Sequence, residues 1–438
     1  MKVHTDVEPS LGKSMTWRGL KKVANPDAPV QKELQMIFAD AQKAMKHPTA
    51  VEKARFHEAY TIAAEKTDED AHLNATEMLK KYEYPVEEHT VQTDDGYFLT
   101  LFRIKKQQIS DETAKPVVFL MHGLLGSADD WLLMGPGKSL AYLLADAGYD
   151  VWLGNARGNK YSRRHASKHP AMNDYWLFST DQIALHDVPA MMDYALTTSG
   201  QEKLHYVGHA LGTTAFFALA ASYPAYNEKI ISMHALSPMA YMTHARSPLM
   251  RMVAPTSYFE ARLRHLVGHG AFEPSKELIA SIGGDMCLAE IGCKNVCSNV
   301  NFVMSGISIE GVDAAQAAVV VAHLPAGGSI RTIKQYGQAV ASGEFRKYDY
   351  GPTVNSQVYG TVEPPKYNMS RVTAPVTLYS AAEDWLAHPA DVTRLQAELP
   401  HSEYYEVPEP HFAHMDFQFS PQATELVYKK LINSLSSY

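Results

Sequence analysis

The sequence has few cysteines, no long apolar run and no excess of basic residues, and each shortage narrows the possible functions. Its three cysteines, Cys287, Cys293 and Cys297, stand close together, which excludes a scaffold held by many disulfides. No uninterrupted apolar stretch is long enough to cross a bilayer, so we expect no transmembrane segment. A net charge of -8 with scattered basic residues argues against nucleic acid as a partner.

Signals for the cellular compartment are weak and point in two directions. The opening MKVHTDVEPSLGKS lacks the apolar core of a signal peptide, so the chain is either cytosolic or numbered after its signal was removed. The clustered cysteines favour one local disulfide with a spare thiol over a zinc site, since no histidines cluster near them. Together with glycosylation sequons at Asn74 and Asn368, this favours a secreted, lysosomal or yolk protein. We expect no cofactor and no metal.

A change of pattern divides the chain into two parts. Residues 1–71 are polar and helix-patterned, with the apolar residues of PVQKELQMIFADAQKAMKH on one helical face. Thr49 and Glu52 form a capping box for a second helix. Residues 72–438 alternate strands with helices. The sequence therefore predicts an N-terminal helical extension without catalytic residues, followed by one α/β domain.

Four apolar stretches of the second part predict buried strands. They read KPVVFLMHG, YDVWLGNARG, KLHYVGHA and APVTLYSAAEDW, and a hairpin that turns at Asp95 and Gly96 precedes them. Strands this apolar are typical of a mostly parallel sheet with helices on both faces. From about residue 240 to 370, a Met-, His- and Gly-rich stretch breaks the alternation and predicts an inserted cap or lid above the strand ends.

The stretch HYVGHALGTTAFFALAASYP has the layout of a nucleophile elbow, in which a serine is expected at the position that Ala210 occupies. Thr213 and Thr214 lie further along the helix and are expected to face elsewhere, so we predict no replacement nucleophile. The backbone N–H of Leu211 and that of Leu124, in the loop HGLLG, are expected to form an oxyanion hole. The elbow is thus complete except for the attacking atom.

An acid and a base follow the elbow in the order that α/β-hydrolases use. Asp384 comes directly after the strand VTLYS, and His414 comes after the strand EYYEVPE near the C-terminus. Glu383 and His411 are the less favoured alternatives. The pattern predicts an acyl-transfer site in which a carboxylate orients the histidine that acts as base.

From about His72 to the C-terminus the chain resembles the acid lipase family, which includes gastric and lysosomal acid lipases and insect relatives. The resemblance rests on YPVEEHTVQTDDGYFLTLFRI, HGLLGSADDW, GYDVWLGNARGNKYSRRH, GQEKLHYVGHALGTT, HLPAGGSIRTIKQYGQAV, YDYG and HMDF. It implies the α/β-hydrolase fold, a mobile lid, and the acid, base and oxyanion roles given above. It also implies a disulfide between Cys287 and Cys297.

The family's elbow usually reads Gly-His-Ser-Gln-Gly, and this chain departs from it at Ala210 and Leu211. The resemblance implies descent from a hydrolase of triacylglycerols or sterol esters, which is inert as written because alanine cannot form an acyl-enzyme. The alternative is a native, non-catalytic homologue that binds lipid or serves as a yolk or storage protein. An alanine introduced by experiment fits the retained acid and base, whereas the neighbouring Leu211 favours a natural departure. Lipid esters, fatty acids and a lipid–water interface are the expected partners, and the oligomeric state stays open.

Overall fold

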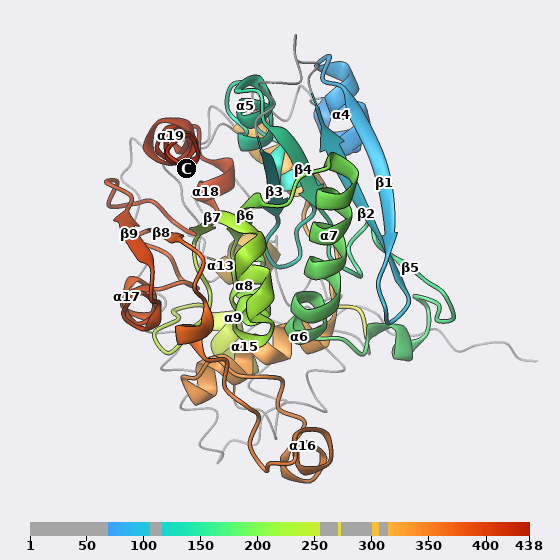
Figure 1. The fold of residues 1–438 in the computed structure, drawn as a ribbon, viewed down its shortest axis with the longest axis vertical. Coiled ribbons are helices and arrows are strands. Elements are labelled where there is room, and N and C mark those ends of the chain that lie inside the picture. The colour runs from blue at the N-terminus through green and yellow to red at the C-terminus, as the bar shows by residue number, and fades with distance from the viewer. Residues whose placement is uncertain (1–68, 106–115, 255–269, 273–299, 306–313) are drawn as a thin grey trace, which may run out of the picture.

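A sheet of nine strands runs through the described part of the chain (Figure 1). The strand order is β1-β2-β4-β3-β6-β7-β8-β9, and the short β5 (Arg164–His165) pairs with β2. The computed structural model describes residues 69–105, 116–254, 270–272, 300–305 and 314–438. The predicted helices before residue 69 and all three cysteines lie outside these ranges.

The predicted hairpin forms one edge of the sheet. Strands β1 (Val86–Gln92) and β2 (Tyr97–Ile104) pair antiparallel, and Gly96 in their turn has a φ of 97°, which favours glycine. On its other side β2 pairs antiparallel with β4 (Asp150–Gly154). From β4 onward every pairing along the sheet is parallel. The sheet is therefore mostly parallel, as the apolar strand stretches predict.

The parallel strands place their carboxyl ends along one edge, where the loops of the candidate site begin. They are β4 and β3 (Val117–Met121), β6 (Leu204–His209), β7 (Ile230–Leu236), β8 (Val376–Ser380) and β9 (Ser402–Glu406). Sequence analysis missed β7, because polar residues interrupt its apolar pattern. Two of these polar residues, Ser232 and His234, are buried. Ser232 Oγ lies 3.0 Å from His234 Nε2 and 2.7 Å from His205 Nδ1 in the neighbouring strand β6.

Helices cover both faces of the sheet, and each face has its own hydrophobic cluster. Successive residues of β3 point to opposite faces, so Phe119 packs in one cluster and Val118 in the other. Figure 1 shows α7 (Val188–Ser199) and α8 (Leu211–Ser222) in front of the strands. The other face is covered by α4 (Ala75–Lys81), α5 (Leu140–Asp146) and α19 (Lys429–Leu435).

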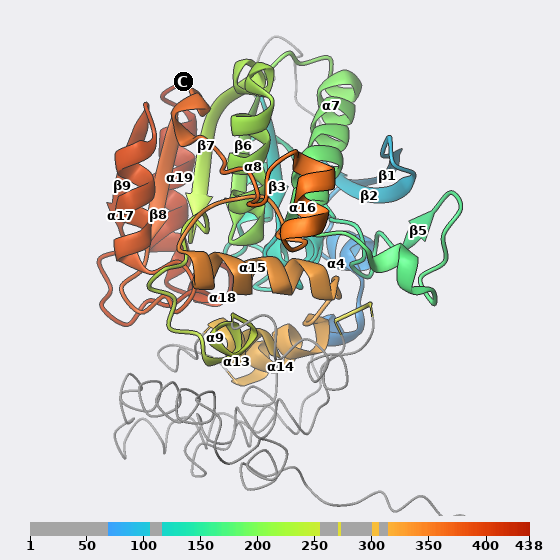
Figure 2. The same cartoon turned by 90° about the horizontal axis from the view of Figure 1, so that it is seen from below.

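The described parts of the predicted cap lie against the loop that follows β3. They comprise α9 (Pro248–Val253), α13 (Val300–Ser305), α14 (Ala314–His323), α15 (Ile330–Ser342) and α16 (Pro352–Tyr359), and Figure 2 shows the first four grouped at one end of the sheet. Ala326 N–H donates to the Leu125 carbonyl at 2.7 Å, and Asn301 Nδ2 donates to that of Leu124 at 3.3 Å. Movement of this segment as a lid stays a prediction.

The remaining elements are short, except for α17 (Pro389–Glu398) beside the last two strands. The short helix α6 (Thr180–Gln182) and the π-helical η5 (Ile183–Asp187) lead directly into α7, and the π-helical η8 (Thr424–Tyr428) leads directly into α19. The others are α18 (Asp416–Phe419) and the 3-10 segments η1 (Glu69–His72), η3 (Ala128–Trp131), η4 (Asn173–Trp176), η6 (Pro224–Lys229) and η7 (Met369–Arg371). Among the helices of the described residues we find none with the length and apolar character needed to span a bilayer.

Candidate active site

Strand β6 and helix α8 meet at Ala210 in a strained turn. Ala210 has φ 47° and ψ -107°, a conformation that residues with a side chain rarely adopt. The flanking glycines allow the turn to be this tight. A Cβ at Gly208 would lie 2.7 Å from the Gly212 carbonyl carbon, and one at Gly212 would lie 2.3 Å from the Met121 carbonyl oxygen. The Gly-X-Ala-X-Gly spacing therefore follows from the close approach of strand, turn and helix.

The two threonines that follow the elbow use their hydroxyl groups to bind backbone. Thr213 Oγ1 donates to the Ala210 carbonyl at 2.6 Å, and Thr214 Oγ1 donates to that of Met239 at 2.5 Å. Both side chains are buried. Neither hydroxyl therefore stands where an elbow serine would present its oxygen, in agreement with the expectation that they face elsewhere.

The structure brings Asp384 and His414 into direct contact. His414 Nδ1 lies 2.9 Å from Asp384 Oδ1 and 3.1 Å from Oδ2, and both residues are buried. The N–H groups of Leu386 and Ala387 donate to Asp384 Oδ1 at 2.9 Å and 2.8 Å. Burial raises the pKa of the Asp384 carboxyl, but the charge and hydrogen bonds of its neighbours, His414 first, outweigh it and hold that pKa below its usual value. An ionised Asp384 fixes the His414 proton on Nδ1.

The alternative acid and base lie in other surroundings. Glu383 faces Arg246, with 3.7 Å between its Oε2 and the Arg246 Nη1. His411 is half-buried, and its backbone N–H donates to Glu409 Oε1 at 3.3 Å. Among the two candidate acids and two candidate bases, Asp384 and His414 are the pair in contact. Their catalytic roles stay a proposal.

Ser237, which sequence analysis missed, completes this contact. It follows β7 directly with a φ of 54°, is fully buried, and lies with Oγ 2.5 Å from Asp384 Oδ2 and 2.6 Å from His414 Nδ1. In a serine hydrolase, the histidine accepts the proton of the serine on its Nε2 atom. Ser237 contacts Nδ1 instead, so it lies on the side of the ring that faces the carboxylate. Ser237 therefore contacts the candidate acid and the candidate base from a position that an elbow serine would not occupy. Because β7 was not recognised, the Ser-Pro pair after it gave no usable signal.

A second histidine ties the elbow to the loop of His414. His209 Nε2 lies 3.0 Å from the His414 carbonyl oxygen, and the two rings are 4.8 Å apart between centroids. Burial lowers the pKa of His209 to about 3, so the ring is neutral and carries its proton on Nε2. The elbow and the base thus keep a fixed spacing even without a serine between them.

The loop after β3 lies against the elbow and is held by His122. Its Nδ1 donates to the Gly123 carbonyl at 2.7 Å, and its Nε2 accepts from Ala156 N–H at 3.0 Å. A Cβ at Gly123 would lie 3.5 Å from the Ala210 Cβ. Leu211 is the first residue of α8, so its N–H has no acceptor within the helix. This placement is compatible with oxyanion donors at Leu124 and Leu211, which remains a prediction.

Two small cavities share Leu124 as a lining residue. The first reaches the base and is lined by Gly123, Leu124, Asp130, His209, Asn301, Met304, Ser305, Leu386, His414, Met415 and Gln418. The second lies beside the start of α8 and is lined by His122, Leu124, Leu125, Ala156, Arg157, Asn159, Phe178, Ile183, Leu211, Gly327, Gly328 and Thr332. Leu211, which departs from the glutamine of the family's elbow, contributes an apolar wall to the second cavity.

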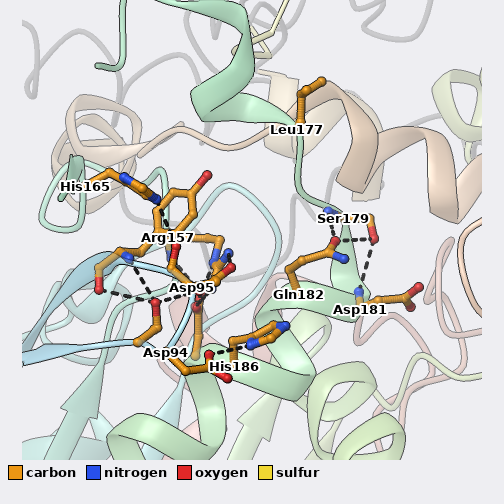
Figure 3. A network of polar contacts seen from close by, with 12 residues as sticks. Asp94, Asp95, Arg157, His165, Leu177, Ser179, Asp181, Gln182 and His186 are labelled. Carbon is orange, nitrogen blue, oxygen red and sulfur yellow. Dashed lines mark hydrogen bonds and ion pairs between the residues drawn. The ribbon is translucent and has the colours of Figure 1, made fainter. Parts of the chain in front are cut away.

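A polar network beside the second cavity includes a group of metal-binding residue types. Asp94, Asp95 and His186 place one ligand atom each within 4.8 Å of one another (Figure 3). All three already have partners: His186 Nδ1 lies 2.6 Å from Asp94 Oδ1, and Arg157 Nη1 lies 2.5 Å from Asp95 Oδ2. Arg157 also pairs with the buried Asp187, so we interpret the group as ion pairs that hold the hairpin turn against η5.

Both predicted glycosylation residues are exposed helix caps. Asn74 Oδ1 accepts from Glu77 N–H at 3.0 Å in a capping box for α4, and Asn368 Oδ1 accepts from Ser370 N–H at 3.0 Å. Exposure meets one requirement for a glycan, and modification stays a prediction.

Comparisons with known proteins cover most of the chain. Residues 75–135 match the family described as a partial alpha/beta-hydrolase lipase region, and residues 116–288 match the alpha/beta hydrolase fold. Lipase 3 of Drosophila melanogaster is 41% identical over 357 residues, which cover 81% of this chain and 91% of that protein. Gastric triacylglycerol lipase of Bos taurus is 37% identical over 370 residues, 84% of this chain and 92% of its own. A solved carboxylesterase from Bacillus subtilis has a TM-score of 0.45 and 14% identity, over 89% of this chain and 100% of its own.

Proposed function

Because the chain belongs to the acid lipase family of α/β-hydrolases, we propose that it descends from a carboxylic ester hydrolase and binds lipid esters without cleaving them. One observation carries this proposal: a methyl group occupies the elbow position, while the acid and the base beside it are in contact. Triacylglycerols and sterol esters are the proposed ligands, with fatty acids as smaller ones. The gastric lipase among the relatives supports this ligand class by its name alone.

The reaction stops at its first step in this chain. In an intact site the serine hydroxyl attacks the ester carbonyl, His414 accepts its proton on Nε2, and Asp384 stabilises the resulting imidazolium. Ala210 offers no lone pair, so no acyl-enzyme forms. The proposed donors at Leu124 and Leu211 would still polarise a bound carbonyl, which leaves at most a residual acceleration of roughly 10³ to 10⁴ over water in sites of this kind.

Lipid binding does not require the nucleophile. Acyl-chain affinity comes from apolar burial, at about 25 cal/mol per Å² removed from water, and a methyl group in place of a hydroxyl makes the site slightly more apolar. Leu211 acts in the same direction, because it lines the second cavity. We favour a secreted, lysosomal or yolk compartment for such a protein, where lipid–water interfaces occur.

Two measurements on the unmodified chain test the proposal. We expect no turnover of short p-nitrophenyl esters above background and no labelling by a serine-directed phosphonate. After delipidation, native mass spectrometry with a fatty acid or a diacylglycerol should show saturable one-to-one binding. Phosphonate-sensitive turnover would contradict the claim of inertness, and absence of binding at tens of micromolar, roughly -6 kcal/mol, would contradict the lipid-binding role.

A further inference from the structure

The cavity that reaches His414 has a polar wall whose atoms lack partners in the described part of the chain. They are Asp130 Oδ1, His209 Nδ1 and Gln418 Nε2. The three residues are no more than 4% exposed. A buried polar atom without a hydrogen bond costs about 1 to 3 kcal/mol, so three of them around one cavity point to a ligand or water that satisfies them.

Two glycines keep this wall open. A Cβ at Gly123 would lie 2.8 Å from His209 Nδ1, so any other residue there would cover that nitrogen. A Cβ at Gly126 would lie 2.0 Å from Asp130 Oδ2, so the carboxyl group of Asp130 would have to move. Both glycines belong to the loop after β3, which therefore leaves room for the polar side chains as well as for the elbow.

The hydrogen-bonding character of the wall follows from its protonation states. His209 carries its proton on Nε2, so its Nδ1 is an acceptor. Burial, followed by the charge of the neighbouring Asp129, raises the pKa of Asp130 to about 8, so at neutral pH its carboxyl is protonated and can donate. The amide nitrogen of Gln418 also donates. The wall therefore presents one acceptor beside two donors.

Only some ligand groups match this combination. A carboxylate would place its lone pairs against the lone pair of His209, and an ammonium would place its N–H groups against those of Gln418. A hydroxyl group donates one hydrogen bond and accepts others, so it can satisfy His209 and Gln418 at the same time. Apolar side chains line the cavity as well, among them Leu124, Leu386 and Met415. The complementary ligand is thus a hydroxyl attached to an apolar chain.

The position of the cavity indicates which part of an ester it faces. His414 lines it, and in an intact hydrolase the histidine donates a proton to the leaving alcohol. Leu124, whose N–H is the proposed partner of the ester carbonyl, lines it as well. We propose that this wall binds a free hydroxyl on the alcohol part of the ester, so that hydroxylated esters, such as partial acylglycerols, are preferred over fully esterified or apolar ones. This inference rests on the proposed lipid-binding function.

A pair of esters that differ by one group tests the inference on the unmodified protein. The probes are 2-hydroxyethyl laurate and n-propyl laurate, which have the same length and differ by a hydroxyl in place of a methyl. Because the chain is expected to be inert, titration calorimetry at pH 7 gives equilibrium affinities for both. We expect the hydroxyethyl ester to bind about 10-fold more tightly, or about 1.4 kcal/mol.

Two variants assign that preference to the wall. Gln418→Leu should remove the preference and leave the affinity for the propyl ester within a factor of about two. Thr332→Val is the matched control, since Thr332 Oγ1 is also buried without a partner in the described residues but lines the other cavity. The control should keep the full preference, and thermal unfolding checks that both variants fold.

Each outcome has a distinct meaning. Equal binding of the two esters to the unmodified protein would overturn the inference, because the wall then holds only water, and it would do so even if Gln418→Leu failed to fold. A preference that survives in a folded Gln418→Leu protein would also overturn it. Absence of binding by either ester would instead contradict the proposed function itself.

Discussion

The two ends of the candidate site differ in what they retain. At one end, Asp384, His414 and Ser237 form a buried set of contacts between 2.5 and 3.1 Å. At the other end, the elbow has a strained backbone at Ala210, with a methyl group where a serine is expected. The comparison teaches that the backbone geometry of the elbow does not depend on a serine side chain.

The glycines, and not the residue between them, maintain the elbow. A left-handed conformation at a residue with a Cβ costs about 1 to 3 kcal/mol and persists where the surroundings enforce it. Here Gly208 and Gly212 let the strand and the helix approach closely, whichever small side chain stands at Ala210. We therefore expect the same backbone with a serine at position 210, and the comparison can be tested from either end.

The largest effect is expected from Ala210→Ser, which places a serine hydroxyl at the elbow opposite the candidate acid and base. If the elbow has kept its geometry, the restored hydroxyl meets His414, and esterase activity on p-nitrophenyl esters should rise by roughly three orders of magnitude or more. Adding His414→Ala must abolish the gain. A folded but inert Ala210→Ser protein would show that more than the nucleophile has been lost.

The next largest effect is expected from Gly212→Ala, which disturbs the backbone packing of the elbow. Its Cβ would meet the Met121 carbonyl oxygen at 2.3 Å, so we expect the free energy of unfolding to fall by about 3 kcal/mol or more. Urea unfolding measures the change. Gly328→Ala is the control, because its Cβ would meet only the tip of Leu125 at 3.1 Å, and its effect should stay below about 1 kcal/mol. Similar losses in the two variants would contradict a special role for the elbow glycine.

Asp130→Asn tests the cavity that reaches His414 through the pH dependence of stability. The folded pKa of Asp130 is about 8, well above the value of about 4 in an unfolded chain. Its contribution to stability is fully present below pH 4 and is lost as pH rises to 8, because the unfolded chain releases the proton first. Between pH 5 and 8 the unmodified protein should therefore lose roughly 3 to 4 kcal/mol of unfolding free energy relative to the Asp130→Asn variant, whose amide does not titrate. This loss is about two thirds of what the full shift corresponds to.

Denaturant titrations of both proteins at the two pH values measure this difference. Asp129 offers a contrast of opposite sign. Burial raises its pKa, but His323 and Lys160 outweigh burial and hold that pKa below the usual value, so its contribution is lost only as the pH falls. An identical pH dependence of stability in Asp130→Asn and the unmodified protein would contradict a protonated Asp130.

The smallest effect is expected from Ser237→Ala, measured in the serine-restored protein. Ser237 donates to Asp384, so its removal leaves a carboxylate that attracts the proton of His414 more strongly. We expect kcat/KM to fall about 10-fold, with the acidic limb of the pH profile moving to higher pH. Ser232→Ala is the control, since this buried serine lies in β7 and contacts His205 and His234 instead. A lower rate with an unmoved pH profile would indicate a merely structural role.

Much of the fold could be predicted from the sequence, because strands of a buried parallel sheet consist of continuous apolar runs. The stretch KPVVFLMHG contains β3, VTLYS became β8 with the expected bounds, and the hairpin turned at Gly96. Strand β7 was missed because its buried residues include Ser232 and His234, which hydrogen-bond to each other inside the sheet. Polar residues in a buried strand interrupt the continuous apolar run by which such a strand is recognised. The elbow, in contrast, could be predicted, because the spacing of its glycines is required by local backbone packing and is visible in a short stretch of sequence.

The sequence by itself predicted an elbow with Ala210 at its serine position, and named Asp384 and then His414 as the candidate acid and base. These features are local: each depends on a few neighbouring residues and on the chemistry of one side chain. Only the tertiary structure decided that Ser237 contacts both Asp384 and His414, and that Asp130, His209 and Gln418 line one cavity. Such contacts depend on how strands far apart in the sequence align and pack, and no local pattern records that alignment.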